Sequence, residues 1–179
     1  MILPLASAST FIAAAITLAG FGPAPVAPAT PLKVDPPARE ELLRAGPLGD
    51  RAIGNPNAPV TVIEYASLTC PHCRKFHAEV FPRVKSAYID TGKVRYIVRE
   101  FPIGRTAGAA AIINRCAPEE MYFFLLDAFL SRQAEWVTQE VRRDAIYGVA
   151  KSSGMSRETF DKCLSNQTII EGLTEVKQR

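Results

Sequence analysis

The chain of 179 residues has no strong charge excess and few metal-ligating side chains. Its formal net charge is +3, which is too small to indicate nucleic acid or a membrane surface as the partner. It has two histidines, four cysteines and no second C-x-x-C pair, so it lacks the ligand spacing of the common structural zinc sites. With 47% hydrophobic residues, it is long enough for one globular domain with its own core.

Charge is also absent from the amino-terminal segment, because no Asp, Glu, Lys or Arg precedes Lys33. The apolar run over 11–19 is shorter than the roughly 20 residues that span a bilayer, and 27–29 reads Ala-Pro-Ala, an A-x-A cleavage pattern. We therefore expect residues 1–29 to be a signal peptide that directs export to a compartment where disulfides persist. Because the segment has no basic residue near its start, a disordered tail and an uncleaved anchor remain as alternatives.

A linker and one domain are expected after this segment. Residues 30–50 begin with many prolines and alanines and then predict a short helix over 37–46, which Gly46 ends. No internal repeat is visible. Residues 51–179 are expected to form a single domain.

The predicted domain opens with a strand, a helix and a second strand. Residues 60–66, "VTVIEYA", are rich in β-branched side chains and predict a buried strand. Apolar residues then recur at helical spacing over 71–90, where Pro82 should kink the helix, and 93–101 predict the next strand. This order predicts a βαβ unit with parallel strands. The rest of the chain has no strand pattern, and helices are predicted over 106–117, 118–133, 138–154, 156–165 and 166–179.

Cys70 and Cys73, with Pro71 and His72 between them, lie where the first strand ends and the helix begins. A zinc clamp would use His72 or His77 and would still need a further ligand. A structural disulfide across two residues closes too short a loop to stabilise the fold much. These two interpretations stay open, but the local chemistry favours a third, a redox centre.

The start of a helix stabilises a negatively charged sulfur, because its backbone N–H groups lack partners and its dipole is positive there. Cys70 occupies this place, Pro71 suits the first helical position, and His72 adds a donor or a positive charge. A stabilised Cys70 thiolate makes the disulfide an oxidant. Cys73, one turn into the helix, is expected to be more buried and to act as the resolving thiol.

Glu64 lies inside an apolar strand, six residues before Cys70. One interpretation is a surface carboxylate at the sheet edge. The other is a partly buried acid beneath the disulfide that relays the proton of Cys73. Both remain open from the residues alone.

The stretches "GNPNAPVTVIEYASLTCPHCRKFHAEVFP" and "VRYIVREFPI", followed by the helical block, resemble the DsbA-like thiol:disulfide oxidoreductases of bacterial periplasms. The resemblance runs from about Gly54 to the end of the chain. It implies an α/β thioredoxin-like fold interrupted by a helical subdomain, here about 104–166. It also implies that Cys70 attacks, Cys73 is its partner, His72 tunes the pair, and Glu64 is the buried acid.

The same resemblance suggests a role for the other two cysteines, Cys116 and Cys163. Some relatives look similar there and have a second, non-catalytic disulfide. Such a bridge would contribute roughly 4 kcal/mol by the chain-entropy relation. Two free buried thiols are the alternative. The resemblance implies no metal and no organic cofactor.

The carboxyl-terminal part of the family's fold is expected to be missing from this chain. The family continues past its helical block with a cis-proline loop, two antiparallel strands and a final helix. No strand-like run follows Asn166 here. The remaining sheet edge should then be unpaired and partly apolar.

The expected function is that of a periplasmic oxidoreductase that oxidises the cysteines of unfolded or reduced exported proteins. A membrane quinone-linked partner would reoxidise the pair, as the resemblance implies. Two alternatives remain. One is a disulfide reductase or isomerase, and the other is a truncated, non-catalytic remnant that only binds peptides or partners.

Overall fold

The computed structural model describes residues 38–178. The predicted signal peptide, residues 1–29, and the first part of the predicted linker lie outside the described residues. Within the described part, no helix has the length and apolar character needed to cross a membrane. The short helix predicted over 37–46 is present as α1 (Arg39–Leu43).

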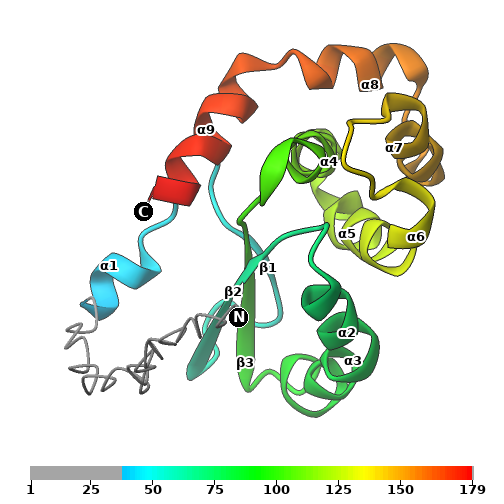
Figure 1. Cartoon of the computed structure of the whole chain (residues 1–179). Coiled ribbons are helices and arrows are strands. Elements are labelled where there is room, and N and C mark those ends of the chain that lie inside the picture. Colours follow the sequence, from blue (N-terminus) through cyan, green and yellow to red (C-terminus); the bar gives the residue numbers. More distant parts are fainter. Residues whose placement is uncertain (1–37, 179) are drawn as a thin grey trace, which may run out of the picture. The chain divides into compact units, whose positions relative to one another are not determined.

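Three strands form a mixed sheet in the order β1-β3-β2 (Figure 1). Strands β2 (Val60–Ala66) and β3 (Val94–Glu100) are parallel, which confirms the predicted βαβ unit. Strand β1 (Arg51–Ile53) pairs antiparallel with β3 and was not predicted. Three residues are too few to show an alternating pattern, so the sequence offers no signal for this strand.

The prediction that residues 60–66 form a buried strand is wrong. In the described part of the chain, β2 pairs only with β3 and is an edge strand. Val60, Val62 and Tyr65 are exposed, whereas every residue of β3 except Arg95 is buried. β-branched composition indicates a strand, but the position of the strand in the sheet decides its burial.

The helix that connects β2 to β3 breaks once, close to the proline that was expected to kink it. Helix α2 (Pro71–Glu79) ends before Val80, and α3 (Phe81–Val84) begins with Pro82 in its first turn. A π-helical turn, η1 (Lys85–Ile89), follows. Proline has no N–H to donate within a helix, so the first turn is where it fits.

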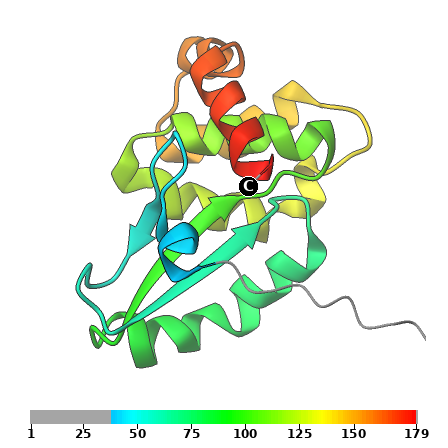
Figure 2. The ribbon, with the colours of Figure 1, turned by 90° about the vertical axis from the view of Figure 1, so that its left-hand side faces the viewer.

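Helices make up the rest of the fold (Figure 2). They are α4 (Gly104–Cys116), α5 (Tyr122–Ser131), α6 (Gln133–Trp136), α7 (Arg143–Ala150), α8 (Arg157–Leu164) and α9 (Gln167–Gln178), with the short 3₁₀ turns η2 (Glu119–Met121) and η3 (Lys151–Ser153). The Ser156 side chain accepts a hydrogen bond from the backbone N–H of Thr159, so Ser156 is the N-cap of α8.

The single helix predicted over 118–133 is wrong, because the structure divides this segment into η2, α5 and α6. Arg132 leaves the helical conformation, with φ −100° and ψ 21°, and this ends α5. The buried indole N–H of Trp136 then donates to the carbonyl of Phe129 at 2.8 Å. Tertiary packing of the tryptophan thus overrides a locally continuous helical pattern.

The main core lies between β3 and the helices that follow it. Its largest fully buried side chains are Trp136, Tyr96, Tyr122, Phe129, Phe160 and Ile113. Arg99 on β3 connects the second half of the predicted linker to the sheet. Its guanidinium donates to Asp50 at 2.9 Å and to the carbonyl of Leu42 at 2.9 Å. The second half of the predicted linker therefore packs on the domain.

Candidate active site

Cys70 is the N-cap residue of α2, four residues after the end of β2 at Ala66. Its backbone is extended, with φ −76° and ψ 121°, and Pro71 takes the first helical position. Cys73 lies one turn further into α2, and both cysteines are free thiols of intermediate exposure. The strand therefore delivers one cysteine to the helix start, where unpaired N–H groups face it.

The two thiols have opposite pKa shifts. Partial burial by itself would raise the pKa of Cys70, but hydrogen bonds from the Cys73 backbone, the Cys73 thiol and the His72 backbone lower it overall. Burial raises the pKa of Cys73 to about 11, helped by the hydrogen bond and charge of Cys70 and by the charge of Glu64. These shifts favour the thiolate form at Cys70 and the thiol form at Cys73.

We expect this asymmetry to appear as two separate titrations of the reduced protein. Thiolate absorbance followed against pH should show Cys70 ionising below the ordinary value of roughly 8.5 and Cys73 only near about 11. Joint titration of both thiols around the ordinary value would contradict the expectation.

The same shifts set the pH dependence of the reduced fold's stability. Ionised Cys70 stabilises that fold above the unfolded pKa, and the contribution is lost as pH falls through the lowered folded pKa. Neutral Cys73 stabilises it below the unfolded pKa, and that contribution is lost as pH rises towards about 11. Chemical denaturation of the reduced protein at several pH values measures both.

His72 was expected to tune the pair through its imidazole. The structure leaves this side chain exposed on the first turn of α2. His72 contributes through its backbone N–H, which lowers the pKa of Cys70 together with the backbone and the thiol of Cys73. A tuning role of the imidazole stays a prediction.

Glu64 lies partly buried, with its side chain 15% exposed, beside the polar groups of His77 and Tyr96. Its Oε2 atom is 3.0 Å from His77 Nε2 and accepts a hydrogen bond from the Tyr96 hydroxyl at 2.6 Å. Burial and the bond to Glu64 raise the pKa of Tyr96, so its hydroxyl keeps its proton and remains a donor. The charge of Glu64 also helps to raise the pKa of Cys73.

His77 and Tyr96 were not recognised as site residues from the sequence, where His77 was weighed only as a zinc ligand. The signal for His77 was its spacing, because a residue four places after Cys73 lies on the same helix face. Tyr96 pairs with Val62, two residues before Glu64, so its side chain lies on the same face of the sheet as that of Glu64. That neighbour depends on strand register, which the sequence does not specify.

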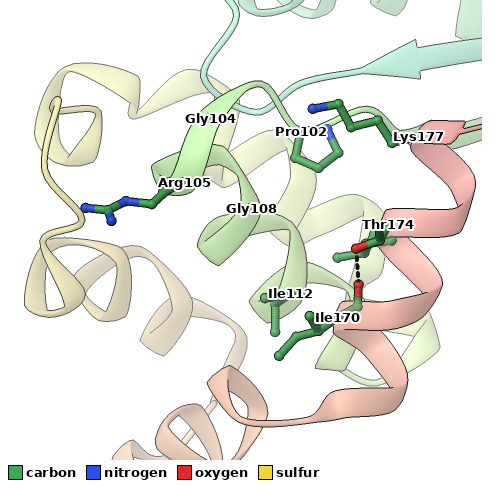
Figure 3. A pocket seen from close by; sticks show the side chains of 9 residues that line it. Pro102, Gly104, Arg105, Gly108, Ile112, Ile170, Thr174 and Lys177 are labelled. Carbon is green, nitrogen blue, oxygen red and sulfur yellow. Dashed lines mark hydrogen bonds between the residues drawn. The ribbon is translucent and has the colours of Figure 1, made fainter.

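Two hollows meet at the start of α4, and one of them reaches the residue before Cys70. One of about 520 Å³ begins at Thr69, next to Cys70, and is bounded by the start of α4 and by residues 137–139. Another of about 380 Å³ lies between α4 and α9, where Ile112 and Ile170 approach each other and Arg105 points away (Figure 3). Gly104 and Arg105 line both, so the start of α4 separates the two hollows.

The remaining cysteines form a disulfide in this structure. Cys116 at the end of α4 bonds to Cys163 in α8, with their Cα atoms 5.9 Å apart. The bond joins two helices that are 47 positions apart in sequence. It is separate from the free pair on α2.

Comparison with known proteins gives consistent matches. A family described as thioredoxin matches residues 48–179. The "Putative protein-disulfide oxidoreductase" of Rickettsia bellii is 36% identical over 125 residues, covering 69% of this chain and 48% of that protein. Disulfide bond formation protein D of Bacillus subtilis is 27% identical over 128 residues, covering 67% of this chain and 56% of that protein.

Among solved structures, α-DsbA1 of Wolbachia pipientis superposes with a TM-score of 0.71 at 34% identity, covering 79% of this chain and 71% of the other. The chain spans about half the length of the rickettsial relatives it matches, at 48% of the Rickettsia bellii protein.

Proposed function

This chain belongs to the thioredoxin family, among its DsbA-like oxidoreductases, and we propose from this that it oxidises the cysteines of exported proteins through the Cys70–Cys73 pair. The observation that carries the proposal is the asymmetry of the pair at the start of α2. The pKa of Cys70 is lowered by N–H donors, while the pKa of Cys73 is raised by burial. A low-pKa thiol leaves readily and makes its disulfide a good oxidant.

The proposed reaction has two exchange steps. A substrate thiolate attacks Cys70 Sγ of the oxidised pair, a substrate–Cys70 disulfide forms, and Cys73 leaves as a thiolate that takes up a proton. A second substrate thiolate then attacks the substrate sulfur of this mixed disulfide. The substrate disulfide forms, Cys70 leaves as the stabilised thiolate, and two electrons have passed to the pair.

Glu64 is proposed to carry the proton of Cys73. Its carboxylate is held by His77 and Tyr96, and only a small part of it reaches solvent. When Cys73 leaves, the carboxyl group supplies a proton, and when the pair is reoxidised it accepts one. The Tyr96 hydroxyl keeps the carboxylate in place because it remains a donor throughout.

Replacing Glu64 by glutamine tests this role. The amide keeps the shape but carries no exchangeable carboxyl proton, so the rate of exchange at Cys73 should fall by about 10²-fold near neutral pH. Stopped-flow measurement of reoxidation by a small disulfide reports that rate. Glu79→Gln, at the exposed end of α2, is the matched control and should react like the wild type. An unchanged rate and pH profile in Glu64→Gln would remove Glu64 from the proton path.

The direction of the reaction distinguishes the alternatives. A redox titration of the pair, together with oxidation of reduced ribonuclease and reduction of insulin, separates an oxidase from a reductase or isomerase. We expect net oxidation, because the stabilised Cys70 thiolate favours the reduced pair. Net reduction of insulin without ribonuclease oxidation would favour the reductase.

A binding function without catalysis is the second candidate, and the exposed edge strand favours it. Val60, Val62 and Tyr65 present apolar side chains beside the unpaired backbone edge of β2 in the described part of the chain. An extended peptide could add to such an edge. Peptide binding by a chain that fails both exchange assays would support this candidate.

Periplasmic location and reoxidation by a membrane quinone-linked partner complete the proposal. The polar, partly exposed position of the pair suits exchange with a protein partner. Fractionation of cells that express the full chain, with the redox state of Cys70 and Cys73 trapped by alkylation, tests location and reoxidation together.

A further inference from the structure

We propose that Gln133 on α6 is a positioning residue for Cys70, which goes beyond the roles assigned above and rests on the proposed use of Cys70 as the reacting thiol. Its side-chain amide donates one hydrogen bond to the carbonyl of Leu68 at 2.8 Å and another to the carbonyl of Cys70 at 3.0 Å. Gln133 is only 7% exposed, so these bonds are made away from bulk water. Both amide protons are used on the backbone that presents the redox pair.

The segment that Gln133 holds is the turn between β2 and α2. Within it the backbone N–H of Cys70 donates to the carbonyl of Ser67 at 3.0 Å. The Cys70–Pro71 peptide has no N–H, because Pro71 supplies the nitrogen, so its carbonyl is the only polar group through which it can be fixed. That carbonyl already accepts the first helical bond from Arg74 at 3.1 Å, and Gln133 adds a second bond from outside the helix.

The consequence concerns the sulfur of Cys70. The N–H groups of His72 and Cys73 lower its pKa only while Cys70 keeps its extended N-cap backbone. Without Gln133 the buried Leu68 carbonyl would lose the partner that the structure gives it, and the turn would be expected to move to recover one. The N–H donors and the sulfur would then separate, so the thiolate would lose stabilisation.

α6 is suited to this positioning because it is itself fixed. Trp136 is fully buried, and its indole N–H donates to the carbonyl of Phe129 in α5 at 2.8 Å. Its ring also meets the Phe129 ring edge-on, with centroids 5.2 Å apart. α6 is thus held rigidly where Gln133 can reach the turn between β2 and α2. The backbone geometry at Cys70 therefore depends on a residue 63 positions away in sequence.

The test compares Gln133→Leu with Gln167→Leu, the latter at an exposed position at the start of α9. The rate of Cys70 alkylation is followed against pH in the reduced Cys73→Ser background, with thermal unfolding measured in parallel. We expect Gln133→Leu to raise the pKa of Cys70 and to slow alkylation about tenfold at pH values below that pKa. Gln167→Leu should alkylate like its parent.

A purely structural role predicts a different pattern. Gln133→Leu would then lower the unfolding temperature while the alkylation profile stayed that of the parent, and this result would overturn the inference. Should Gln133→Leu not fold, Gln133→Asn decides, because its shorter side chain keeps an amide but cannot reach both carbonyls. If Cys70 titrates as an ordinary thiol in the Cys73→Ser parent, that result counts against the proposed function instead. Failure of this inference and failure of the proposed function are therefore distinguishable.

Discussion

Replacing Cys70 by serine is expected to abolish thiol oxidation, which is the largest effect predicted for this protein. The variant keeps Cys73, but no disulfide can form on α2 without Cys70, so the chain has no oxidising equivalent there to pass to a substrate. Burial also raises the pKa of the Cys73 thiol, and the protonated thiol is a poor nucleophile in exchange. We expect the rate of reduced-ribonuclease oxidation to fall at least about 10³-fold.

The matched control is Cys73→Ser, which keeps the attacking thiol. In this variant the Cys70 thiolate should attack a disulfide of an oxidised substrate and release one substrate thiolate, and the mixed disulfide that forms should persist because no resolving thiol remains on α2. Non-reducing electrophoresis would show the adduct with Cys73→Ser and none with Cys70→Ser. Wild-type oxidation by Cys70→Ser would exclude Cys70 as the attacking residue and overturn the main proposal.

Loss of the Cys116–Cys163 disulfide is expected to have the largest effect on stability. The bond joins positions 47 apart in sequence, and the chain-entropy relation gives about 4 kcal/mol for a loop of this length. For a domain of this size that amounts to roughly 10 °C in unfolding temperature. Because both cysteines lie in helices after the βαβ unit, we expect the packing between α4 and α8 to be lost first when the disulfide is absent.

The clean measurement uses a chain in which Cys70 and Cys73 are both replaced by serine. Only the second disulfide can then form, so the oxidised and reduced forms differ by that cross-link alone. Urea unfolding of both forms gives the difference in free energy without the cavity that alanine would leave at Cys163, which is buried. Equal free energies of unfolding would show that the bond contributes nothing to the fold.

The fold class was accessible from the sequence because its signals are local. β-branched residues between turn residues indicated β2 and β3, and the helix between them required a parallel pairing. The helices predicted over 138–154 and 156–165 end at Gly154 and begin at Ser156, and in the structure Gly154 follows η3 at φ 80° and Ser156 caps α8. Each of these inferences depends on a few neighbouring residues.

The two predictions that the structure contradicts share a different cause. β2 was taken as buried because of its composition, and residues 118–133 were taken as one helix because of their pattern. Burial depends on how many strands flank β2, and the break at Arg132 accompanies the packing of Trp136 under Phe129. The number of strands beside β2 cannot be inferred from the residues of β2, and the packing of Trp136 cannot be inferred from residues 118–133.

The place of the cysteine pair at the start of α2 follows from the sequence alone. Two cysteines at a strand-to-helix junction, with Pro71 after the first, place Cys70 at a helix start whatever the rest of the fold does, and unpaired N–H groups there favour a thiolate. Tertiary structure alone decided the surroundings of the pair. Tyr96 meets Glu64 through strand register, and Gln133 reaches Cys70 from α6. Local backbone chemistry can be derived from neighbouring residues, whereas the partners of a buried polar group depend on which distant segments the core brings together.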